Sequence, residues 1–279
     1  MELAFIIIGI GLYGLASVLA VVSFVRPGPS TERNVRVSMA AGSTALLAIL
    51  LLHGVRSGTV PAFSRFDAMA CYSVAATAAY LHMAMKDRTR GISIIIAPYL
   101  TAMLILAVSS GYTGTVKAPA VQNMWLGLHV LTAFVSYALF SLAGILALAY
   151  VLQDNNLKRK RITTLSRLPA LETLDRLMSH QVGIAFLTLT VSIVLGFVLV
   201  RMTGGDGRWL TDPKVAATVM TWAVYAVLVH MRASAGRHGR GLALVTVLGF
   251  CCVLFAFVGV HAIANSVHSF PLISVPVGQ

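Results

Sequence analysis

The sequence has little charge and few cysteines, and each shortage excludes a class of protein. Only 11% of its 279 residues are charged, whereas a soluble domain carries about 25%. With 58% hydrophobic residues and a mean hydropathy of +0.85, the composition excludes a soluble globular enzyme, a disordered chain and a fibrous protein. The three cysteines form no CxxC or CxxCH motif, which excludes a thiol pair of that kind and covalent haem attachment. The composition therefore predicts a polytopic integral membrane protein.

Eight apolar stretches are candidates to cross the hydrocarbon core, which takes about 20 helical residues. They predict an all-α fold, a bundle of eight transmembrane helices in one membrane domain over residues 1–279. The first four spans lie in residues 1–118, and the second half covers residues 119–270. The eight stretches are Leu3–Val25, Val37–Val55, Phe66–Met85, Ile92–Ser109, Trp125–Leu152, Val182–Val200, Ala216–Met231 and Leu242–Ile263.

Lysine and arginine are distributed unevenly between alternate connections. Fifteen of the 21 lie in the first, third, fifth and seventh connections. By the positive-inside rule these connections face the cytoplasm, so we expect both termini outside. The net charge of +12 then reflects topology and predicts membrane lipid, not nucleic acid, as the charged partner. This orientation gathers His53, His129, His261 and His268 at the outer face, and imidazole is a common haem-iron ligand.

Further predictions concern the leucines of the long fifth connection, the ionisable residues of the spans and the motifs that are missing. Leucines recur at helical spacing between Leu165 and Met178, which predicts an amphipathic helix lying on the cytoplasmic lipid surface. Asp67 is the one carboxylate that we expect as an intramembrane charge. We interpret His53 and His261 as structural. No nucleotide-binding loop, nucleophile constellation or zinc-ligand spacing is found in the sequence, so no enzyme activity is predicted.

Six segments between residues 120 and 270 resemble the cytochrome c assembly protein family. That family includes the CcsA-type haem handlers of cytochrome c maturation and the shorter HemX-like and YpjD-like membrane proteins. The segments keep the family's order: WLGLHVLTAFVSYALFSLAGILALAYVLQDNNLK (125–158), RLPALETLD (167–175), RWLTDPK (208–214), MTWAVYAVLVHMR (220–232), GRHGRGLALVTVLGF (236–250) and FVGVHAIANSVHSF (257–270).

The resemblance implies a haem site at the outer face. In the CcsA branch two external histidines are the axial ligands of the haem iron, and the matching positions here are His129 and His268. A Trp-rich haem-presenting loop lies between them, where this chain has Trp209, Asp212 and Lys214. The implied cofactor is haem b, held without a covalent bond and ligated by His129 and His268.

Several of these residues also have a structural interpretation. Asp212 and Pro213 suit the N-cap and first turn of a helix without any ligand. Trp209 either stacks on a porphyrin or anchors at the membrane interface, and Lys214 or Arg208 is a candidate partner of a haem propionate. His230 matches a family histidine of a transmembrane haem site, but the helix dipole alone also favours a histidine there.

The loop departs from the family pattern, and two functions therefore remain open. Thr211, Val215 and Ala217 stand where the family has Trp, Glu and Trp. One function is haem binding at the outer face of the inner (plasma) membrane, with a CcsB-like subunit or apocytochrome c as partner. The other is a HemX-like or YpjD-like accessory protein without haem, with a haem-synthesis enzyme as partner. Both imply a multi-pass protein that coordinates or regulates, rather than an enzyme.

Overall fold

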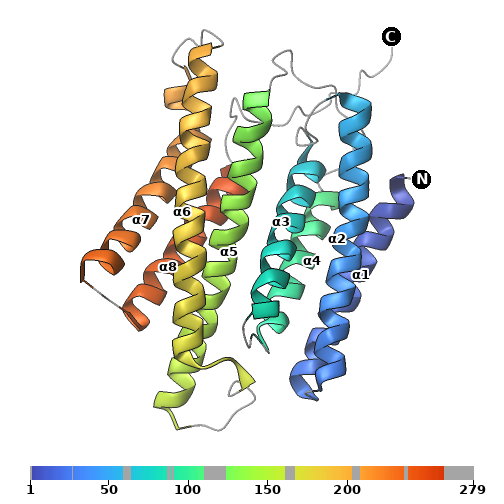
Figure 1. Ribbon diagram of the computed structural model, residues 1–279, viewed down its shortest axis with the longest axis vertical. Helices are drawn as coiled ribbons and strands as arrows, with labels where there is room; N and C mark the ends of the chain where they lie inside the picture. Colours follow the sequence, from blue (N-terminus) through green and yellow to red (C-terminus); the bar gives the residue numbers. More distant parts are fainter. Residues whose placement is uncertain are drawn as a thin grey trace.

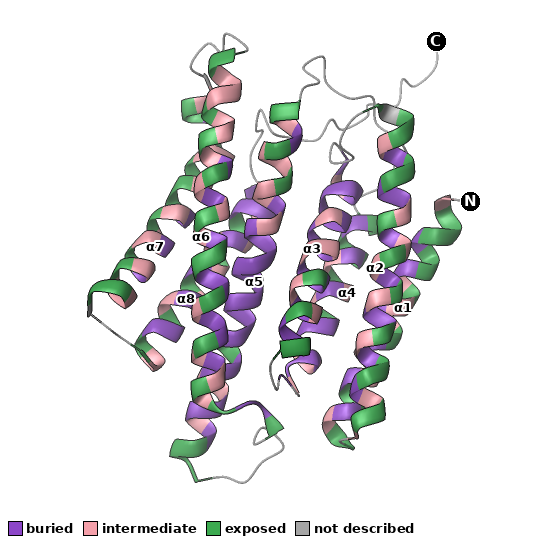
Figure 2. Ribbon diagram, in the orientation of Figure 1, coloured by how far each residue is buried: buried purple, intermediate pink, exposed green. Residues whose placement is uncertain are grey.

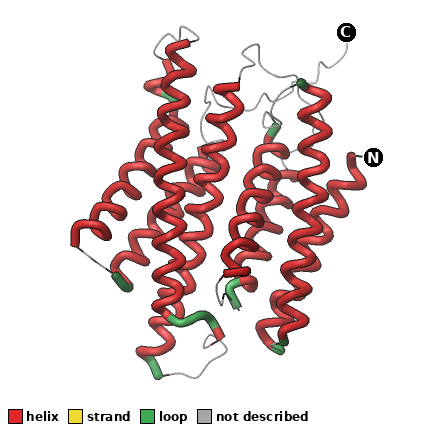
Figure 3. Tube along the Cα trace, viewed as in Figure 1, coloured by secondary structure: helices red, strands yellow, loops and turns green. Residues whose placement is uncertain are grey.

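A computed structural model describes residues 2–26, 28–58, 64–86, 89, 91–109, 124–160, 167–202, 208–235 and 238–260. Within these ranges the chain is helical apart from short connections, and no strand occurs (Figure 3). Each predicted span overlaps an α-helix of the described residues, which confirms the all-α class, and residues 261–263 of the eighth span lie outside them. The helices are α1 (Glu2–Val25), α2 (Pro29–Ser57), α3 (Arg65–Lys86), α4 (Ser93–Ser109), α5 (Met124–Lys158), α6 (Leu171–Met202), α7 (Pro213–Ala235) and α8 (Arg240–Leu254), with a short 3-10 turn η2 (Arg208–Thr211) before α7 and a π-helical turn η3 (Phe255–Gly259) after α8.

Six of these helices are long and apolar enough to cross a membrane: α1, α2, α5, α6, α7 and α8. Helix α4 is apolar but has only 17 residues. Helix α3 carries polar residues, and it packs against α2, α4 and α5, so its polar face meets protein rather than lipid. The chain is therefore a polytopic membrane protein in which α3 occupies the interior.

The helices form two groups that follow the order of the sequence. Helices α1–α4 lie together, as do α5–α8, and α3 packs against α5 where the groups meet (Figure 1). Aromatic rings link the groups there: Tyr72 stacks on Phe257 with centroids 5.0 Å apart, and Tyr99 meets Phe250 edge-on at 5.8 Å. Buried residues concentrate on α3 and α5, and the outer faces of α1, α6 and α7 are largely exposed (Figure 2).

The prediction of an amphipathic helix on the lipid surface is wrong for residues 168–178, which the structure describes. Residues from Leu171 onward are the first turns of the continuous helix α6. Leu174, Leu177 and Met178 are buried in the protein core, and Leu168 joins them. The leucine spacing marks a face that packs against protein, so these side chains are not available to lipid. Leu165 lies outside the described residues.

A buried carboxylate ties the first group of helices together at the end that carries the basic connections. Glu32, 7% exposed, belongs to α2. Its Oε2 accepts hydrogen bonds from the Ser23 hydroxyl of α1 at 3.0 Å and the Ser93 hydroxyl of α4 at 3.2 Å. Its Oε1 accepts one from the Tyr80 hydroxyl of α3 at 3.4 Å. One side chain thus joins four helices.

We predict that Glu32→Ala lowers the stability of the folded protein by about 1–3 kcal/mol, the cost of leaving buried donors without their acceptor. The measurement is the midpoint of thermal unfolding of the detergent-purified protein, followed by loss of helical circular dichroism. Glu172→Ala removes an exposed carboxylate and is the matched control. Equal midpoints for the two variants would contradict the role assigned to Glu32.

Candidate functional site

The site begins with His129, in the second turn of α5. Its Nδ1 lies 2.8 Å from the backbone carbonyl oxygen of Ser192 on α6. A carbonyl only accepts hydrogen bonds, so Nδ1 carries the hydrogen and, in the neutral ring, Nε2 carries the lone pair. Among the described residues, no hydrogen bond is made to Nε2. The ring therefore has Nδ1 bonded to α6, and the lone pair of Nε2 has no hydrogen-bond donor among the described residues.

Ser192 and Gly196 are two residues of α6 that contact His129. The Ser192 hydroxyl donates to the backbone oxygen of His129 at 3.0 Å, so the two helices are joined in both directions. Gly196 lies one turn further along α6, with its backbone against the imidazole. The structure thus places His129 in the interface between α5 and α6, partly exposed, on two rigid helices.

Trp209 and Asp212 lie in and just after η2, the short turn that leads into α7. The indole of Trp209 meets Phe197 of α6 edge-on, with centroids 6.0 Å apart and planes at 73°. Asp212 is 3% exposed, and its Oδ1 accepts the backbone N–H groups of Lys214 at 2.8 Å and Val215 at 3.2 Å. Asp212 is therefore the N-cap of α7, which confirms the structural interpretation of that residue.

Hydroxyl contacts hold the first half of α7 against the helices that carry His129. The Tyr137 hydroxyl of α5 lies 2.9 Å from Thr218 Oγ1, and the Trp222 indole donates to Thr190 Oγ1 of α6 at 3.0 Å. Lys214, at the start of α7, is thereby placed within electrostatic reach of His129. An anionic ligand bound near His129 would therefore be attracted by the ammonium of Lys214 at the same end of the protein.

The structure does not bring His230 to this site. His230 lies sixteen residues after Lys214 on α7, which is about 24 Å of helix. It is exposed at the opposite end, where its ring lies 3.3 Å from the Ser234 hydroxyl. His268 and His261 lie outside the described residues. Of the predicted site residues, the structure therefore places Trp209, Asp212 and Lys214 at the end of the bundle that holds His129.

A second histidine at the same end is engaged on both sides. His53 of α2 is 1% exposed; its Nδ1 lies 2.7 Å from Oδ1 of Asp67 on α3, and its Nε2 lies 3.8 Å from Oε2 of Glu2 on α1. The hydroxyl of Ser64 accepts the backbone N–H of Asp67 and so fixes the start of α3. These contacts agree with the structural interpretation of His53 and give Asp67 its partner.

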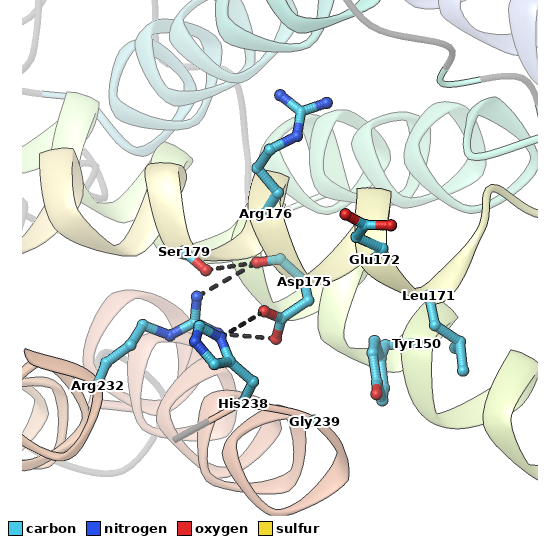
Figure 4. Close-up of a pocket in the computed structure, with 9 residues that line it drawn as sticks. All are labelled: Tyr150, Leu171, Glu172, Asp175, Arg176, Ser179, Arg232, His238 and Gly239. Atoms are coloured by element: carbon cyan, nitrogen blue, oxygen red, sulfur yellow. Dashed lines mark hydrogen bonds and ion pairs between the residues drawn. The ribbon is translucent and has the colours of Figure 1, made fainter. Parts of the chain in front are cut away.

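An open cavity of about 700 Å³ lies at the opposite end, between the end of α5, the start of α6 and the α7–α8 connection (Figure 4). Asp175 is its centre: Oδ1 accepts from Arg232 at 2.9 Å, and Oδ2 lies 3.1 Å from His238 Nδ1. The carboxylate therefore engages both Arg232 and His238, and the cluster ties α6 to α7. The lining residues are Tyr150, Leu171, Glu172, Asp175, Arg176, Ser179, Arg232, His238 and Gly239.

In the part of the chain that the structure describes, no group of three or more His, Cys, Asp or Glu residues could hold a metal ion. A closed metal site is thus not formed there, whereas a haem iron takes at most two axial ligands from protein. Sequence reasoning missed Ser192 and Gly196, which support His129. The one available signal was a lone glycine within an apolar helix, which indicates close packing without naming its partner.

Comparisons with known proteins cover most of the chain. Residues 58–268 match the family model described as Cytochrome C assembly protein. The cytochrome c biogenesis protein CcsA of Chlamydomonas reinhardtii is 27% identical over 242 residues, which cover 84% of this chain and 67% of that protein. CcsA of Synechococcus sp. (strain CC9902) is 28% identical over 266 residues, covering 85% of this chain and 86% of that protein. CcsA of Trieres chinensis is 22% identical and covers 96% of both.

The family match runs from the end of α2 to beyond the end of α8 and includes His129, η2 and all of α7. It spans well over half of the 279 residues. The helices, the order of the motifs and the matched length agree, and the chain belongs to the cytochrome c assembly protein family.

Proposed function

We propose that this protein binds and handles haem in cytochrome c assembly, with His129 and His268 as axial ligands of the haem iron at the outer face of the membrane. The relatives named above are cytochrome c biogenesis proteins, which supports the general role. The observation that carries the site is the hydrogen bond from His129 Nδ1 to the Ser192 carbonyl. Metal-ligating histidines usually make such a bond with the nitrogen that does not face the metal.

The residues around His129 fit the chemistry of a haem. A bound haem would supply an iron for His129 and His268 to ligate, an apolar ring and anionic propionates. His129 offers Nε2 to the iron, and the Trp209 indole offers an aromatic face near the end of α6. Lys214 offers a cation to a propionate. Asp212 acts through the backbone, because its cap fixes the first turn of α7, in which Lys214 lies.

We further propose that all eight helices span the inner (plasma) membrane with both termini outside. The helices alternate in direction, so the starts of α3, α5 and α7 share one end with the ends of α2, α4 and α6 (Figure 1). The basic connections lie at the other end, which the positive-inside rule assigns to the cytoplasm. The site around His129 then faces outward, where a CcsB-like subunit or apocytochrome c could take the haem.

The accessory function is the second candidate, and the segment from η2 into the first turns of α7 favours it. Thr211, Val215 and Ala217 lack the aromatic and acidic groups that the family pattern has there, and the described ring contact of Trp209 is with Phe197. A HemX-like or YpjD-like protein would meet a partner, such as a haem-synthesis enzyme, without holding haem. Haem binding by the purified protein separates the two functions.

The orientation predicts where a reporter active only in the cytoplasm will work. Fused after Gln279 it should be silent, and inserted between Lys160 and Arg167, in the connection from α5 to α6, it should be active. The measurement is reporter signal normalised to protein amount. The reverse pattern would place His129 at the cytoplasmic face and would overturn an external haem site.

The ligand assignment predicts a low-spin spectrum, since two imidazoles give the iron a strong axial field. The purified protein, reconstituted with haem and reduced, should show sharp low-spin bands. His129→Ala and His268→Ala should each convert iron to high spin or lower haem affinity about 10-fold or more. Added imidazole should partly restore the bands.

His82→Ala is the control for this experiment, because His82 is exposed on α3 near the opposite end. Its spectrum should match that of the unsubstituted protein. If the unsubstituted protein takes up no haem under reducing conditions, haem ligation is wrong and the accessory function replaces it.

A further inference from the structure

Gly196 contacts the ring of His129 more closely than any other residue type would allow. A Cβ atom built on Gly196 would lie 2.9 Å from Cε1 and 3.1 Å from Nδ1 of the imidazole. Contacts of a Cβ below 3.0 Å essentially never occur, so an alanine here would force the ring or the helix to move. The glycine is therefore required by close approach between α5 and α6.

The ring has little freedom to yield. Its Nδ1 is bonded to the Ser192 carbonyl at 2.8 Å, and the Ser192 hydroxyl is bonded to the His129 backbone at 3.0 Å. These bonds fix both the side chain and the backbone of His129 against α6, one helical turn before Gly196. A methyl group on Gly196 can be accommodated only if the imidazole rotates away from the carbonyl or α6 separates from α5.

We infer that Gly196 and the Ser192 carbonyl are positioning residues for His129: together they hold its imidazole in one tautomer and one orientation, with Nε2 directed to the ligand. Ser192 selects the nitrogen that keeps its hydrogen, and Gly196 leaves the space against α6 that Cε1 and Nδ1 of the ring need. This inference rests on the proposed function for its consequence, because the ligand that Nε2 would meet is the haem iron.

The chain contains a matched control for this role. Gly183 belongs to the same helix, and a Cβ added there would meet nothing within 4 Å. Gly183→Ala and Gly196→Ala therefore make the same chemical change on α6 and gain the same helix propensity. Only the second places a methyl group against His129.

The test compares Gly196→Ala, Gly183→Ala, His129→Ala and the double variant His129→Ala/Gly196→Ala, as full-length protein reconstituted with haem. We expect Gly196→Ala to lower haem affinity about 10-fold and to raise the high-spin fraction, as loss of an orienting contact does at metal sites. Imidazole should restore its low-spin bands. Gly183→Ala should behave as the unsubstituted protein, and Gly196→Ala should add no further loss when His129 is already alanine.

Each alternative outcome decides one claim. If the unsubstituted protein binds haem and Gly196→Ala binds it with the same affinity and spin state, the positioning role is overturned and the proposed function stands. If the unsubstituted protein binds none, the proposed function fails, and the ring is examined directly by ¹⁵N NMR of labelled histidine. Unchanged His129 signals in Gly196→Ala would then overturn the inference, and a change of tautomer in that variant would support it.

The double variant His129→Ala/Gly196→Ala also keeps the inference testable if Gly196→Ala alone does not fold. If Gly196→Ala alone does not fold but the double variant folds as well as His129→Ala, the methyl group acts through the imidazole and the inference is supported. If the folding defect persists without the imidazole, Gly196 serves the packing of α6 itself and the inference is wrong.

Discussion

The arrangement of the helices depends on a few buried or partly buried polar side chains, Glu32, His53 and His129, that each meet partners on neighbouring helices. Each membrane helix satisfies its own backbone groups, so polar side chains have only each other and a few backbone atoms to meet. Glu32 gathers hydroxyls from three other helices, and His53 meets Asp67. His129 meets the Ser192 carbonyl. Because an unsatisfied buried group is costly, each contact specifies which helices are neighbours.

His53 and His129, which lie near the same end of the bundle, differ in how many of their ring nitrogens are bound to protein. His53 has a carboxylate toward each ring nitrogen and is buried, so it serves the packing of α1, α2 and α3. His129 is held by one nitrogen only, and its ring remains partly exposed. A ligand-binding imidazole requires this asymmetry, in which protein orients the ring through one nitrogen and leaves the other available.

Rigid helices surround the proposed site, and the loop residues are fixed to them. Helix α5 packs against α6, α8 and α3, so His129 is carried by a central element of the fold. Asp212 caps α7, and two hydrogen bonds, one between the Tyr137 hydroxyl and Thr218 and one between the Trp222 indole and Thr190, dock α7 on α5 and α6. Within the described residues, the groups at this end of the bundle are therefore held on helices, which is the preorganisation that coordination requires.

The sequence alone was sufficient to predict an all-helical fold, the excess of basic residues in alternate connections, and the capping of α7 by Asp212 before Pro213. It did not determine what each helical face packs against, so the leucines between Leu171 and Met178 were assigned to lipid although they face the core. It also could not identify Ser192 and Gly196 as the support of His129, since they lie 63 and 67 residues away along the chain. A backbone carbonyl and a missing side chain leave no chemical signature in sequence, and only the packing of α5 on α6 decides that they meet the imidazole.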